Sequence, residues 1–174
     1  MKAYMEKYPV LKNKPIVATE YGCGSKNRAM VSSSFAAAQL IKLIHGIQEY
    51  KQRDDEYVRV FYHGLHQGGF SRKKNEYAFG LYIKQGGRFY PTAVNFAYRF
   101  LKKWGKQRLN VKGSFFGENI ASIASKDKSR LAVAVYHFDD SINKVNAQAK
   151  VDLIVKNAEN YKKIELFRID SEHH

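Results

Sequence analysis

Residues 15–22 have the sequence Pro-Ile-Val-Ala-Thr-Glu-Tyr-Gly, and this stretch decides the expected fold. Ile16 to Thr19 form a short apolar run with β-branched members and no polar alternation, which is typical of a strand buried on both faces. The run ends at Glu20, and a glycine-containing turn follows. Strands buried on both faces occur in parallel sheets that helices cover. The stretch therefore predicts a parallel strand with an ionisable carboxylate at its carboxyl end.

The residues that follow alternate between helical and strand-like patterns. A long helix is expected at about 30–50, because its apolar side chains form one wide stripe. His45 falls on that apolar side, which predicts a buried histidine with its hydrogen bonds satisfied. Strands are expected at 57–63 and 79–84, the second followed by a tight turn at 85–88. This order of strands and helices indicates βα units and a parallel sheet.

A second amphipathic helix is expected from Pro91 to Trp104. Proline suits the first position of a helix, where its missing N–H is not needed. Gly105 stands where a glycine commonly ends one. The pattern therefore predicts another helix that covers the sheet.

Beyond residue 107 no helical pattern remains. Short strand-like runs recur about every ten residues, separated by polar turns, at Ile120–Ser125, Leu131–Phe138, Ala147–Val155 and Ile164–Ile169. Such spacing is typical of an antiparallel sandwich. The expected fold class is therefore α/β plus all-β, with one domain at 1–107 and another at 108–174.

The composition excludes several function classes. The chain has 174 residues and a single cysteine, which excludes a disulfide framework and a multi-cysteine zinc site. No run reaches the ~18 apolar residues of a membrane span, so no membrane partner is expected. There is no glycine fingerprint for phosphate, no Walker loop and no His-Glu-x-x-His pattern. We therefore expect neither a cofactor nor a metal.

The net charge of +14 is the strongest feature of the composition. It is compatible with nucleic acid, anionic lipid or acidic polysaccharide, and it selects none of them. The densest basic runs are Arg72-Lys73-Lys74, in a polar loop, and Lys102 to Arg108, at the end of a helix. Cations commonly stabilise a helix C-terminus, so neither run requires a nucleic acid. Nucleic-acid binding is therefore not favoured.

Several segments together resemble one enzyme family. Residues 15–22 resemble the seventh strand of the retaining (β/α)₈-barrel glycoside hydrolases of clan A, and residues 58–63 resemble the eighth. Residues 86–93 resemble the turn into the last barrel helix, and residues 120–170 resemble the β-sandwich of family 39, the β-xylosidase-like enzymes. The resemblance implies the last βα units of a TIM barrel at 1–107, followed by an incomplete antiparallel β-sandwich at 108–174. It also implies a fragment, because a whole barrel needs ~250 residues.

The same resemblance assigns Glu20 as the catalytic nucleophile of an enzyme that hydrolyses O-glycosidic bonds. A retaining mechanism also needs a second carboxyl group ~5–5.5 Å away as acid/base. In the clan this is a Glu in an Asn-Glu pair after the fourth strand. Glu118-Asn119 has the reverse order and lies in the other predicted domain. The acid/base is therefore expected outside this chain, and the chain alone is expected to be inactive.

Residues near the predicted strand ends are candidates for substrate binding. A sugar stacks its apolar face on an aromatic ring while its hydroxyl groups need polar partners. Tyr62 and His63 end the second strand and suit this chemistry, although the clan usually has Trp there. His66 and Phe70 lie on the following loop, where specificity often resides, and Tyr21 adjoins the nucleophile. For each of them, ordinary packing is the alternative.

Two other functions stay open. One is a non-catalytic basic module that binds anionic polysaccharide or nucleic acid. The other is an α/β protein that binds an anionic saccharide through its charge, with no role for Glu20. Neutral glycosides need no basic protein, so the +14 charge fits a plain glycosidase least well. A carbohydrate is the expected partner, and the sequence leaves the sugar, the oligomeric state and the localisation open.

Overall fold

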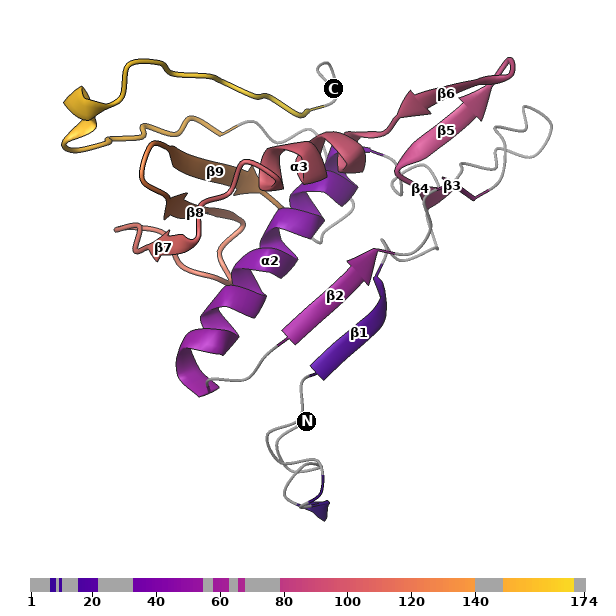
Figure 1. The fold of residues 1–174 in the computed structure, drawn as a ribbon, viewed down its shortest axis with the longest axis horizontal. Coiled ribbons are helices and arrows are strands. Elements are labelled where there is room, and N and C mark those ends of the chain that lie inside the picture. Colours follow the sequence, from indigo (N-terminus) through magenta and orange to yellow (C-terminus); the bar gives the residue numbers. More distant parts are fainter. Residues whose placement is uncertain are drawn as a thin grey trace.

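The computed structural model describes residues 7–8, 10, 16–21, 33–54, 58–62, 66–67, 79–139 and 149–170 (Figure 1). The elements that concern the fold are, in chain order, β1 (Ile16–Tyr21), α2 (Ser34–Asp54), β2 (Val58–Tyr62), β3 (His66–Gln67), β4 (Phe79–Gly80), β5 (Tyr82–Gln85), β6 (Arg88–Pro91), α3 (Ala93–Leu101), β7 (Gln107–Leu109), β8 (Ile120–Lys126), β9 (Leu131–His137) and the 3₁₀ turn η4 (Ala158–Asn160).

The described strands form four small separate sheets. β1 and β2 are a parallel pair, whereas β3–β4, β5–β6 and β7–β8–β9 are antiparallel. A TIM barrel is one closed sheet of eight parallel strands. The expectation of a barrel fragment is therefore wrong. A short apolar run predicts a strand, but it does not specify the strand's neighbour or its direction.

Two glycines reverse the direction of the chain in the hairpin β5–β6. Gly86 and Gly87 have φ of +56° and +78°, which glycine adopts without steric strain because it has no Cβ atom. Two such residues in succession make a tight hairpin turn. The turn folds Arg88–Pro91 back along Tyr82–Gln85. The predicted turn is present, and it joins two antiparallel strands instead of leading directly into a helix.

Helix α3 begins at Ala93, two residues later than expected. Thr92 is the N-cap, and its side-chain oxygen accepts a hydrogen bond from the backbone N–H of Asn95. Such a cap satisfies one of the free N–H groups of the first turn, while Pro91 belongs to β6. The helix ends at Leu101, with Lys102 as its C-cap. Gly105 therefore does not end it.

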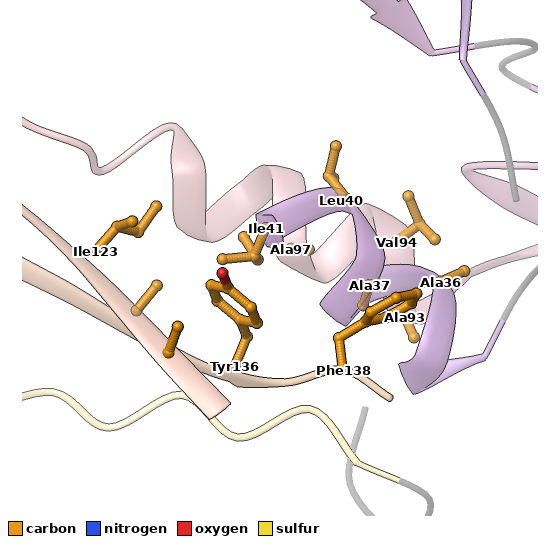
Figure 2. Packing of buried hydrophobic residues seen from close by; sticks show 12 residues of the cluster. Ala36, Ala37, Leu40, Ile41, Ala93, Val94, Ala97, Ile123, Tyr136 and Phe138 are labelled. Carbon is orange, nitrogen blue, oxygen red and sulfur yellow. The ribbon is translucent and has the colours of Figure 1, made fainter. Parts of the chain in front are cut away.

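The hydrophobic core lies between α2, α3 and the β8–β9 pair (Figure 1). Leu40, Val94 and Ile123 are at most 1% exposed. Full burial of such a side chain contributes roughly 1.5–3 kcal/mol. Figure 2 shows Tyr136 and Phe138 lying against the α2 residues Ala37 and Ile41. One core cluster thus contains residues from both sides of position 108.

The segment 149–170 contains η4 and no strand. The expected strands at 147–155 and 164–169 are therefore wrong within the described residues, and so is the sandwich. Only the three-stranded sheet β7–β8–β9 forms in the second half of the described chain. Among the described residues, neither helix combines the length and the hydropathy that a bilayer crossing requires.

Candidate functional site

The parallel pair β1–β2 brings three of the predicted site residues to one edge. Glu20 and Tyr21 are the last two residues of β1, and Tyr62 is the last residue of β2. In the register of the pair, Tyr21 lies opposite Tyr62. Because the strands are parallel, their carboxyl ends meet at the same edge. In open parallel sheets this is the edge at which ligands bind.

The strand is irregular at Glu20. Ala18 pairs with Val60, and the next paired residues are Tyr21 and Tyr62. β1 therefore has two residues, Thr19 and Glu20, where β2 has one between the paired positions. An extra residue of this kind is a β-bulge, which changes the direction of side chains and is frequent beside active sites.

The remaining predicted site residues do not join this edge. His66 lies in β3, where it pairs with Gly80 of β4 in a different sheet. His63 and Phe70 lie outside the described residues. The structure thus brings together the backbone positions of Glu20, Tyr21 and Tyr62, and it places His66 elsewhere.

A second polar group is buried in the core. His45 of α2 is 2% exposed and Tyr136 of β9 is 4% exposed, and the Nδ1 atom of His45 lies 2.9 Å from the Tyr136 hydroxyl. The Nε2 atom of His45 is 3.4 Å from Oε1 of Glu49, and the guanidinium of Arg108 also pairs with that oxygen. The ring of Phe116 packs edge-on against His45, with 5.6 Å between ring centroids.

Electrostatics fix the protonation states of this buried group. Burial lowers the pKa of His45, and the hydrogen bond from Arg108 holds the pKa of Glu49 below its usual value. Burial also raises the pKa of Tyr136 to about 12. At neutral pH the tyrosine is therefore protonated and the histidine neutral. Tyr136 then donates to Nδ1 of His45, and Nε2–H of His45 donates to Glu49.

This group ties α2 to β9 and to β7. Its residues resemble the components of a proton relay, but both His45 and Tyr136 are sealed from solvent. We therefore assign it a structural role. The buried histidine was predicted from the helical pattern, and that prediction is confirmed. Its partners were not predicted, because Tyr136 is 91 residues away in the chain.

The third feature is a pocket of about 600 Å³ beside the β7–β8–β9 sheet. It is lined by Lys106, Gln107, Lys126, Asp127, Lys128, Ser129 and Tyr161. A polar turn was expected between the strands at 120–125 and 131–138. Sequence patterns did not indicate a pocket, because its lining comes from three distant segments. Within the described ranges, no group of three or more His, Cys, Asp or Glu residues gathers as a metal site would.

Comparison with known proteins adds no relative: no family model, curated protein or solved structure matches this chain.

Proposed function

We propose that this chain supplies the nucleophile of a retaining glycoside hydrolase, and that Glu20 is that nucleophile. The observation that carries the proposal is the position of Glu20, in the irregular last step of β1, beside the paired ends Tyr21 and Tyr62. A carboxylate next to a pair of aromatic positions at the carboxyl edge of parallel strands suits a sugar substrate. Function depends on such a site and not on the fold class, so the proposal does not require a barrel.

The proposed reaction has two steps. A carboxylate oxygen of Glu20 attacks the anomeric carbon, and the bond to the leaving oxygen breaks as that oxygen takes a proton from an acid. In the second step, the residue that served as the acid takes a proton from water. The water oxygen attacks the anomeric carbon, and the bond between that carbon and Glu20 breaks. The acid must lie ~5–5.5 Å from Glu20 in such enzymes. The acid is a second carboxyl group, and the proposal identifies the nucleophile alone.

The aromatic positions have a separate role in the proposal. Tyr21 and Tyr62 supply faces on which the apolar side of a pyranose ring stacks, and their hydroxyl groups are hydrogen-bond donors and acceptors. Such contacts hold the anomeric carbon at the nucleophile, and positioning of this kind contributes a large part of the rate.

Kinetics on the natural protein that contains these residues test the proposal. Glu20→Gln should lower kcat by at least about 10²-fold on an activated aryl glycoside, the scale expected for loss of a catalytic carboxylate. Glu159→Gln is the matched control, since it removes the same charge from an exposed residue of η4. Unchanged turnover in Glu20→Gln, or equal losses in both variants, would contradict the proposal.

A further inference from the structure

The pocket beside the β7–β8–β9 sheet is built from segments in direct backbone contact. The N–H of Gly105 donates to Oγ of Ser125, which is fully buried, at 2.9 Å. A Cβ atom on Gly105 would lie only 2.2 Å from the carbonyl carbon of Lys126. Glycine is therefore required for this close approach. This close approach and the pairing of Gln107 with Lys126 hold two walls of the pocket together, the one at residues 106–107 and the one at Lys126.

The turn between β8 and β9 forms a third wall. The carboxylate of Asp127 accepts hydrogen bonds from the backbone N–H groups of Ser129 and Arg130, at 3.0 and 2.8 Å. It also pairs with the guanidinium of Arg130 at 2.8 Å. These bonds lower the pKa of Asp127 to about 2, and the hydrogen bond from the Ser129 backbone has the largest effect. The single carboxylate that lines the pocket is thus already engaged within its own turn.

The three lysines that line the pocket are not engaged in this way. Among the described residues, neither Lys106, Lys126 nor Lys128 has an ion pair with a carboxylate. The pocket lining therefore contains three lysines and one carboxylate, whose charge the guanidinium of Arg130 balances. The amide of Gln107 and the hydroxyl of Ser129 add neutral hydrogen-bonding groups, and Tyr161 adds an aromatic ring.

We propose that this pocket binds an anionic saccharide, a sugar that carries sulfate or carboxylate groups. The ammonium groups suit the anionic substituents, the amide and hydroxyl suit ring hydroxyls, and the aromatic ring suits the apolar face of a pyranose. Its volume of about 600 Å³ is in the range of pockets that hold small organic ligands, larger than an inorganic anion needs. A single aromatic ring in a partly open pocket differs from the row of stacking rings along a groove that single-stranded nucleic acid uses. This site is independent of Glu20.

Calorimetric titration of the 174-residue chain at physiological salt tests the proposal. The probes are a sulfated heparin-derived tetrasaccharide, neutral cellotetraose, inorganic sulfate and a short DNA duplex. The pocket variant is Lys126→Gln with Lys128→Gln. Its matched control is Lys112→Gln with Lys150→Gln, two exposed lysines outside the pocket, with the same change in net charge. Tyr161→Ala tests the aromatic contribution.

The sulfated tetrasaccharide should bind, and cellotetraose should not. The pocket variant should weaken binding about 5-fold or more, and the control double variant less than 2-fold. Tyr161→Ala should weaken binding of the tetrasaccharide and leave sulfate binding unchanged. If the pocket variant fails to melt like the parent, Lys128→Gln alone, at an exposed turn position, serves in its place.

Four results would overturn the assignment. Equal losses of tetrasaccharide affinity in the two double variants would mean that the saccharide is attracted only by the overall positive charge of the chain. Sulfate that binds as tightly as the tetrasaccharide would mean a simple anion site. Tighter binding of DNA, sensitive to the same lysines, would identify a nucleic-acid surface. Absence of any binding by the tetrasaccharide would also refute the proposal.

Discussion

The β8–β9 pair and the segment 149–170 have similar apolar patterns in sequence, yet they fold differently. Ile123 of β8 is 1% exposed, whereas Ile154 is 82% exposed and Ile164 is 91% exposed. Their exposure differs because another layer of the fold covers Ile123 and does not cover Ile154 or Ile164. Helix α2 contacts both β8 and β9, and the apolar face of the pair is buried against it. Of these two regions, the strand-like pattern therefore forms strands in the one whose apolar face is covered by another layer.

The exposed segment is still attached to the rest of the molecule. Lys103, just after α3, pairs with Glu165 at 2.7 Å, and its ammonium lies 4.4 Å from the ring centroid of Phe167. Ile169 packs against the main core. Exposed ion pairs contribute little to stability. The segment is thus held at a few points, while the core is held by continuous packing.

The largest expected effect separates these two regions directly. Leu40→Ala, at a position 1% exposed in α2, should lower the free energy of unfolding by about 2–5 kcal/mol, because it leaves a cavity in the core. Leu166→Ala is the matched control at a position 90% exposed, and it should change stability by no more than about 0.5 kcal/mol. Urea titrations measure both. Similar losses in the two variants would mean that the segment 149–170 belongs to the core.

A smaller effect is expected in the buried polar group that joins α2 to the sheet. Tyr136→Phe removes the hydroxyl that donates to His45 and leaves a buried nitrogen without its partner, which costs about 1–3 kcal/mol. Tyr90→Phe, at an exposed position in β6, is the control and should be within about 0.5 kcal/mol of the parent. If both variants were equally stable, the hydrogen bond would not hold the two layers together.

The smallest expected effect is a pH dependence from the same group. The folded chain holds the pKa of His45 below 6.5, so the unfolded chain binds the proton first as the pH falls. Stability should therefore decrease from pH 7 toward pH 5.5. Glu49, whose pKa is also lowered, adds a loss in the same direction below its usual pKa of 4.5. The neighbouring charged group on β7 is Arg108, which disfavours a second positive charge at His45.

Thermal melts across this range measure the effect. His45→Gln should flatten the curve between pH 7 and pH 5.5, whatever its absolute stability. A parent curve that is already flat there, or a variant that keeps the full slope, would refute the role of His45.

Local features of the fold were predictable from sequence, and non-local ones were not. The helix expected at 30–50 corresponds to α2, the strand at 57–63 to β2, and two of the later runs to β8 and β9. These predictions depend on periodicity, which is a property of each segment alone. The antiparallel hairpin β5–β6 and the exposed segment 149–170 depend on which surfaces meet, and no single segment contains that information.

The candidate sites also contain parts that the sequence predicted and parts that it did not. Glu20 and Tyr62 were expected at the ends of two parallel strands, and the structure pairs these strands in parallel, with Tyr21 opposite Tyr62. The lysine pocket could not be predicted. Lys106 and Lys126 are brought together by the close backbone contact at Gly105 and the pairing of Gln107 with Lys126, and Tyr161 comes from the segment 149–170, which lies in none of the described sheets.

The most direct test of the central claim is covalent labelling of the nucleophile. The natural protein that contains these residues is incubated with a fluorinated activated glycoside, which forms a glycosyl-enzyme that hydrolyses slowly. Peptide mass spectrometry then locates the sugar. The proposal predicts one sugar per chain, on Glu20, and no labelling of the Glu20→Gln variant. A label on any other carboxylate, with Glu20 unmodified, would contradict it.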